Sequence, residues 1–151
     1  MLKVIGLGNS LRGDDGIGPL IIQNLLNDEN DGPVELCDAG SDPFFILEKL
    51  LQPEPVLVID CARMGLKPGS VRKISAKDNG FLESKYGLSL HGFNLADVWK
   101  MAQSMGVEND LIVIGVEPEK MDFNTGLSGT VQKSIPTVIQ MVKEEAEKYA
   151  K

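Results

Sequence analysis

The sequence predicts an α/β fold: a three-layer α/β/α sandwich whose twisted, mostly parallel sheet of about five strands lies between helices. Short aliphatic and β-branched runs alternate along the chain with segments of helical periodicity. Several of these runs are continuously apolar, which is typical of parallel strands covered on both faces. No repeat, low-complexity tract or linker divides the 151 residues. We therefore expect one domain over residues 1–151.

The first third of the chain predicts a strand, a helix and a second strand. Leu2 to Leu7 is predicted to be a short buried strand that ends in glycines. Pro19 suits the first turn of a helix, because its fixed φ is already helical. Apolar residues then recur at helical spacing in two pairs, Ile21/Leu25 and Ile22/Leu26. Residues 30–33 break this helix, and residues 34–37 form the second expected strand.

The middle of the chain predicts a further helix and two strands. Asp42 followed by Pro43 is typical of an N-cap and first helical position, and the helix continues through residues 45–51. The run Val-Leu-Val-Ile at 56–59 has the composition of a buried parallel strand. Residues 70–74 have the pattern of an edge strand.

The last third predicts helix, strand and helix. Residues 93–105 show helical spacing and stop at Gly106, and residues 111–116 form another fully apolar run. The terminal helix is expected over 128–149, with a kink or restart at Pro136 because proline cannot donate to the helical ladder.

Composition narrows the class of protein. The net charge of −7, with scattered Lys and Arg, argues against a nucleic-acid or anionic-membrane partner. No apolar run approaches the roughly 20 residues of a membrane span, and the N-terminal stretch is too short and acidic for a signal peptide. We expect a cytoplasmic protein, most simply a monomer. Cys37 and Cys61 are expected to be reduced, mostly buried thiols.

Ligand sites of open α/β sheets lie at the carboxyl ends of their strands. The first such place is the glycine-rich loop after Leu7. A dinucleotide-binding GxGxxG motif would need glycine at position 11, which is Leu11, and a P-loop GxxxxGK[ST] motif is absent. Tight turns explain some of the glycines. They do not explain the adjacent acids Asp14 and Asp15, which would also repel a pyrophosphate.

Two further polar residues fall at the same expected edge. Asp60 follows the apolar run 56–59, and His91, the single histidine, precedes the helix that starts near residue 93. Either residue alone is compatible with a structural role, as a cap, a turn residue or a core imidazole. Together with Asp15 they provide two carboxylates and an imidazole, a set that can hold a divalent transition metal with positions left open. These ligands suit nickel, zinc, iron or cobalt.

Four segments resemble, in order, the signature blocks of the nickel–iron hydrogenase maturation endopeptidases. They are GLGNSLRGDDGIGP (6–19), VIDCARMGLKPGSVRKI (58–74), LHGFNLADV (90–98) and IGVEPEKMDFNTGLS (114–128). The likeness covers nearly the whole chain. Many members carry glutamate where this chain has Asp15, which we interpret as subfamily variation.

The resemblance implies a function as well as a fold. Such proteases remove a C-terminal extension from the precursor of the hydrogenase large subunit once nickel has been inserted. It implies that Asp15, Asp60 and His91 are the catalytic and metal-contacting residues, that nickel arrives with the substrate, and that Asp14 does not contact the metal.

Other readings of the residues stay open. A non-catalytic α/β module could hold a metal or nucleotide, a self-sufficient peptidase could carry permanent zinc, and a chaperone-like relative could recognise the precursor without cleaving it. The intact Asp/Asp/His set favours cleavage over the last of these.

Overall fold

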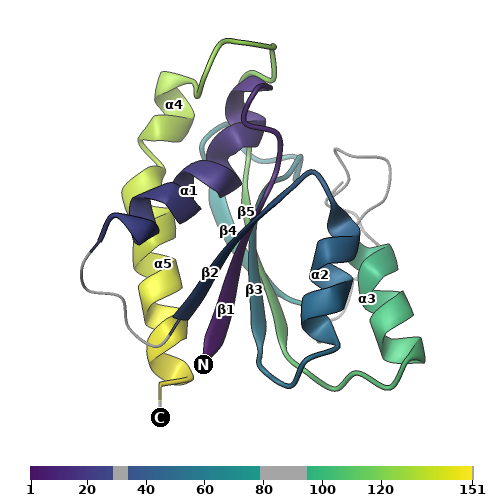
Figure 1. The fold of residues 1–151 in the computed structure, drawn as a ribbon. Coiled ribbons are helices and arrows are strands. Elements are labelled where there is room, and N and C mark those ends of the chain that lie inside the picture. Colours follow the sequence, from purple (N-terminus) through teal and green to yellow (C-terminus); the bar gives the residue numbers. More distant parts are fainter. Residues whose placement is uncertain (29–33, 79–94, 151) are drawn as a thin grey trace.

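The computed structural model describes residues 1–28, 34–78 and 95–150, which form one five-stranded sheet with helices on both faces (Figure 1). The strands are β1 (Leu2–Leu7), β2 (Val34–Gly40), β3 (Val56–Cys61), β4 (Val71–Ser75) and β5 (Leu111–Val116). The helices are α1 (Ile17–Leu26), α2 (Pro43–Leu50), α3 (Leu95–Ser104), α4 (Gly129–Gln132) and α5 (Ile135–Lys148), and a 3₁₀ turn at Gly13–Gly16 precedes α1.

The sheet order is β2-β1-β3-β5-β4. In this order, the four strands from β2 to β5 are parallel, and β4 runs antiparallel to β5 at the edge. The predicted mostly parallel sheet is therefore confirmed. Every residue of β1, β3 and β5 is buried, including the charged Lys3 of β1 and Asp60 of β3. The other residues of these strands are apolar or glycine, as is typical of strands covered on both faces. The edge strands β2 and β4 are only partly buried. All four parallel strands deliver their carboxyl ends to one edge.

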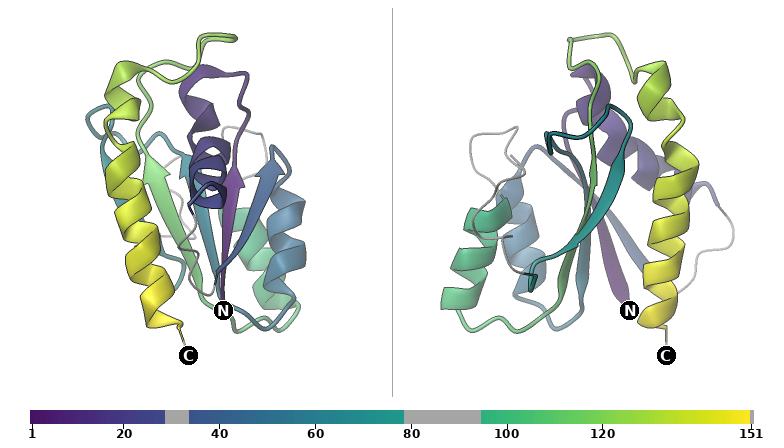
Figure 2. Two further views of the ribbon diagram at one scale, coloured as in Figure 1. Left: turned by 60° about the vertical axis from the view of Figure 1, so that its left-hand side comes forward. Right: turned by 180° about the vertical axis from the view of Figure 1, so that it is seen from behind.

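Two hydrophobic clusters fill the two faces of the sheet. Helices α1 and α5 pack over one face and α2 and α3 over the other, as Figure 2 shows from two sides. Alternation along β3 sends Leu57, Ile59 and Cys61 toward α1 and α5, and Val56 and Val58 toward α2 and α3. The three predicted layers are therefore present. None of the helices in the described ranges combines the length and apolar character that a bilayer crossing needs.

The observed elements extend some of the predicted ones. Strand β2 continues to Gly40, and β3 continues past Ile59 through Asp60 and Cys61. Asp60 therefore lies within the sheet, in register with Gly115 of β5, and does not follow the strand as the sequence suggested. The terminal helix restarts before Pro136, because α4 ends at Gln132 and α5 begins at Ile135. The predicted break at 30–33 lies outside the described residues.

Helix α1 lies unusually close to the sheet because glycines meet at the contact. A methyl group on Gly18 would lie 2.6 Å from the carbonyl oxygens of both Leu7 and Ile59. A methyl group on Gly6 would lie 2.5 Å from the carbonyl oxygen of Gly18. The backbones of α1, β1 and β3 thus touch without side chains between them. This contact fixes the start of α1, and the residues just before it, above the carboxyl ends of β1 and β3.

Replacing Gly18 by alanine should therefore destabilise the protein. The added methyl group would push α1 away from the sheet, and such overpacking costs about 1–3 kcal/mol. The matched control is Gly129→Ala in α4, where an added methyl group meets no atom within 4 Å. We expect denaturant unfolding to show the loss for Gly18→Ala and little change for Gly129→Ala. Equal stability of the two variants would contradict the close contact.

Candidate active site

Asp15 lies in the 3₁₀ turn between β1 and α1, at the carboxyl edge of the sheet. Its side chain is fully buried, and its Oδ2 accepts a hydrogen bond of 3.0 Å from the backbone N–H of Asn9. Gly8 makes this fold of the loop possible: its φ is +147°, and a methyl group there would lie 2.0 Å from the carbonyl oxygen of Asp15. The predicted site residue is thus held by its own loop against the end of β1.

Asp60 is also fully buried, near the carboxyl end of β3. Neither of its carboxylate oxygens has a hydrogen-bond partner of ordinary geometry among the described residues. Burial raises the pKa of Asp60 well above its ordinary value, and the charge of Asp15 raises it further, while the backbone N–H of Cys61 acts in the opposite direction. The structure therefore brings together Asp15 and Asp60, two of the three predicted site residues.

The Cys61 thiol lies among negatively charged side chains. Burial raises the pKa of Cys61, and Asp60, Asp15, Asp14 and Glu117 each raise it further through their negative charge. Its Sγ lies 3.7 Å from Sδ of Met121. A thiol kept protonated in this way is a poor nucleophile. Cys37 is half-buried, and both cysteines are free thiols, as the sequence predicted.

Asp14 is buried beside Asp15 and has a different environment. Its Oδ2 accepts hydrogen bonds from the backbone N–H groups of Glu119 and Lys120, both at 2.8 Å, and from Oγ of Ser128 at 2.9 Å. Its Oδ1 accepts from the backbone N–H of Ser128 at 2.7 Å. Four donors therefore satisfy this carboxylate, and it ties the 117–128 loop to the 3₁₀ turn. The expectation that Asp14 does not contact a metal stays a prediction.

Glu117 is a second buried acid with a structural role, and the sequence had not marked it. Its Oε1 accepts from the backbone N–H groups of Met64 at 2.7 Å and Leu66 at 3.1 Å. It thereby joins the loop after β3 to the end of β5. The available signal was its position directly after the apolar run 111–116, in a loop already expected to lie at the ligand edge.

His91 lies outside the described residues, so its predicted place in the site stays a prediction. Within the ranges that the structure does describe, no group of three or more His, Cys, Asp or Glu side chains is arranged to hold a metal ion. The described part of the candidate site is the carboxylate pair. A pair of oxygen donors suits a hard or borderline divalent cation and leaves most coordination positions to other ligands.

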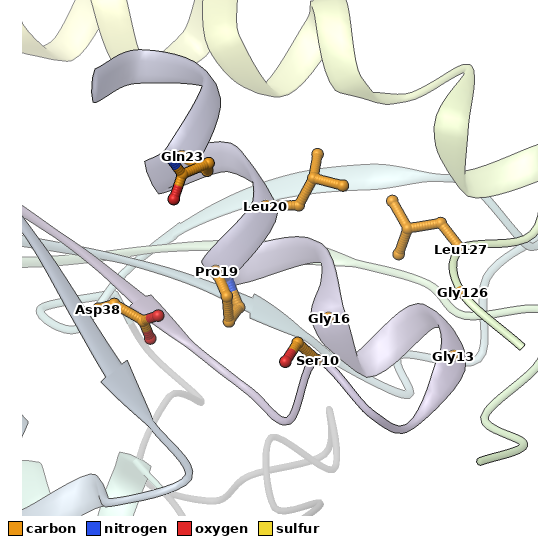
Figure 3. A pocket seen from close by; sticks show the side chains of 9 residues that line it. All are labelled: Ser10, Gly13, Gly16, Pro19, Leu20, Gln23, Asp38, Gly126 and Leu127. Atoms are coloured by element: carbon orange, nitrogen blue, oxygen red, sulfur yellow. The ribbon is translucent and has the colours of Figure 1, made fainter. Parts of the chain in front are cut away.

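A cavity of about 360 Å³, which we call the edge groove, opens beside the 3₁₀ turn (Figure 3). It is lined by residues of the first loop and α1, the end of β2 and the 117–128 loop: Ser10, Gly13, Gly16, Pro19, Leu20, Gln23, Asp38, Gly126 and Leu127. The side chains of Leu20 and Leu127 face one another across it (Figure 3). Because Gly13 and Gly16 belong to its lining, the groove borders the turn that carries Asp15.

Comparison with known proteins decides the family. The hydrogenase maturation protease family model matches residues 20–145. The chain belongs to this family. A putative hydrogenase maturation protease of Methanocaldococcus jannaschii is 29% identical over 97% of both chains. The hydrogenase 3 maturation protease of Escherichia coli is 26% identical over 91% of this chain and 85% of its own length. The family is one of hydrolases, so the buried carboxylates belong to a hydrolytic enzyme.

The fold of this hydrogenase maturation protease is also found in a solved structure. The hydrogenase maturating endopeptidase HybD of Escherichia coli superposes with a TM-score of 0.82, at 24% identity, over 98% of this chain and 93% of that one. At this level of identity the likeness concerns the fold. The predicted family resemblance and the predicted α/β architecture are both confirmed.

Substitution of Asp14 by asparagine should destabilise the protein by about 2–3 kcal/mol, because bonds to a charged acceptor are lost and an amide NH₂ would face N–H donors. The matched control is Asp122→Asn, an exposed carboxylate in the same loop. Chemical denaturation measures both. We call the four hydrogen bonds of Asp14 the Asp14 clamp. If Asp14→Asn unfolded at the same denaturant concentration as Asp122→Asn, the Asp14 clamp would contribute no net stability.

Substitution of Asp60 by asparagine should have the opposite effect. The folded-state pKa of Asp60 is raised. The protonated carboxyl group therefore stabilises the folded protein fully below the ordinary aspartate pKa, and this stabilisation is lost as pH rises through the folded-state pKa. The variant removes the charge, so at neutral pH the metal-free protein should melt higher by roughly 2–8 °C. Its midpoint should also vary less between pH 5 and pH 8. A wild-type midpoint that rises across this range would contradict the assignment, and Asp122→Asn is again the control.

Proposed function

We propose that this protease is an endopeptidase that removes the C-terminal extension of a [NiFe] hydrogenase large-subunit precursor after nickel insertion, and so completes maturation. The observation that carries the proposal is the buried pair Asp15 and Asp60, with both oxygens of Asp60 unsatisfied, at the ligand edge of the sheet. Family membership supplies the class of reaction. The names of relatives, such as the hydrogenase 3 maturation protease, support the substrate.

Two neighbouring buried carboxylates favour the binding of a cation. Each charge loses hydration on burial and repels the other, and a divalent ion between them offsets both costs. In our proposal this ion is the nickel of the substrate, and His91 provides the third protein contact, as the family resemblance implies. The protease recognises a finished metal centre by completing its coordination.

The chemical work of the chain's own residues follows from their burial. Asp15 and Asp60 position the metal-bearing end of the precursor, and the apolar strands beneath them exclude water from the contact. The bound ion supplies Lewis acidity, which can polarise the scissile carbonyl or make a water more acidic. Burial raises the pKa of Asp60 in the metal-free protein, so the binding of nickel competes with protonation of this carboxyl group. Binding and cleavage should both weaken in acid.

We also propose that the protein works in the cytoplasm as a monomer, without nucleic acid or membrane. The acidic composition and the lack of a long apolar run support this setting. A peptidase with permanently bound zinc is the main alternative. Metal analysis of the purified protein separates the two, because stoichiometric zinc would favour the alternative.

Incubation of the nickel-loaded precursor with the protein, followed by mass spectrometry, should show loss of the C-terminal extension. Asp60→Asn and Asp15→Asn should slow cleavage by roughly 100-fold or more, since even indirect metal partners contribute 10–100-fold. Asp122→Asn, an exposed carboxylate of the same edge, should cleave at the normal rate. Nickel-free precursor should stay intact. Normal trimming by Asp60→Asn, or trimming without nickel, would overturn the proposal.

A further inference from the structure

Two large apolar side chains stand in solvent beside the edge groove. Leu11 is 61% exposed and Phe123 is 64% exposed, the highest values among the large apolar residues of the described chain. They lie on two different loops that touch, because the backbone N–H of Asn124 donates to the carbonyl oxygen of Leu11 at 2.9 Å. We call these two residues the apolar rim. Single exposed apolar residues are common, but a pair held together across two loops is typical of a contact surface.

The apolar rim is held in place before any partner arrives. The Arg12 guanidinium lies over the Phe123 ring, 5.7 Å from its centroid. Asn124 adopts a left-handed backbone with φ of +62°, a conformation that asparagine tolerates better than most other residues. The Asp14 clamp joins the same two loops a few residues away. Little conformational entropy remains to be lost when the rim is covered, which favours binding.

The rim continues the edge groove. Leu11 lies between Ser10 and Gly13, which line the groove, and Phe123 precedes the lining residues Gly126 and Leu127. Three of the nine lining residues are glycines, so a second backbone can approach this wall closely. The facing side chains of Leu20 and Leu127 offer an apolar slot (Figure 3). Groove and rim together form a track that borders the turn carrying Asp15.

We propose that this track binds an extended, partly aliphatic stretch of the hydrogenase precursor next to the scissile bond, an inference that rests on the proposed function. The substrate of that reaction is a polypeptide, and its cleaved bond must reach Asp15 and Asp60. The groove and rim border the turn that carries Asp15, so a chain bound along them would lie next to this turn. The rim then provides apolar anchors, and the carboxylate pair provides the metal contact. Recognition of the polypeptide is thereby separate from recognition of its nickel.

The test uses Leu11→Ser/Phe123→Ser in the full protein, with Leu51→Ser/Met105→Ser as the matched control. The control residues are also exposed and apolar, but they lie after α2 and α3, at the opposite end of the molecule (Figure 1). Neither pair contributes to the core, so circular dichroism and melting should be unchanged. Two quantities are measured with nickel-loaded precursor: steady-state cleavage, and the Kd from biolayer interferometry.

The rim variant should raise KM and Kd by roughly 10–100-fold, as losses of interface anchors do, while kcat and the pH profile stay at wild-type values. The control variant should match wild type. An unchanged KM and Kd in the rim variant would overturn the inference and leave the proposed function intact. A wild-type protein that binds the precursor but never cleaves it would count against the proposed function. The Kd values of wild type, rim variant and control variant would still decide the inference. A dimer that dissociates in the rim variant, with normal Kd for precursor, would show that a second copy covers the rim and would overturn it.

Discussion

The burial of two neighbouring carboxylates, Asp15 and Asp60, is the constraint on which the rest of this structure depends. A buried charge without a partner is among the more costly features that a fold can contain. Both residues are fully buried, and both oxygens of Asp60 lack hydrogen-bond partners among the described residues. The surrounding structure must therefore be rigid enough to prevent the two groups from separating into solvent. The central position of β3, paired on both sides, provides one half of that rigidity.

The other half comes from the way the Asp15 loop is fixed. The contact of Gly18 with the carbonyl oxygens of Leu7 and Ile59 sets the height of α1 above the sheet. Asp14 then ties the 3₁₀ turn to the 117–128 loop through four hydrogen bonds. Two acids adjacent in sequence thus have opposite roles. Burial does not distinguish them, because both are fully buried. The four hydrogen bonds from the 117–128 loop identify Asp14 as the acid that joins the two loops.

Much of the fold could be predicted because β3 and β5 contain long apolar runs and helix boundaries carry proline or a capping aspartate, as at Asp42. The end of β3 was predicted too early, since Asp60 is polar and a polar residue suggests that a buried strand has ended. Only the pairing of Asp60 with Gly115 shows that the strand continues. The role of Asp14 was equally hidden, because its donors lie 105 to 114 residues away. The place of His91 in the site stays a prediction from the sequence.

The hydrogen bonds of Asp14 also link the turn that carries Asp15 to the proposed peptide track. Asp14 joins the loops that present Leu11 and Phe123. The hydrogen bond from Asn124 to Leu11 connects the same two loops. A displacement of the 117–128 loop would move the apolar rim and the Asp15 turn together. The hydrogen bonds of Asp14 therefore help to fix the distance between the proposed peptide track and Asp15. In the cleavage that we propose, such a fixed distance would let position along the precursor, more than local sequence, select the bond that is cleaved.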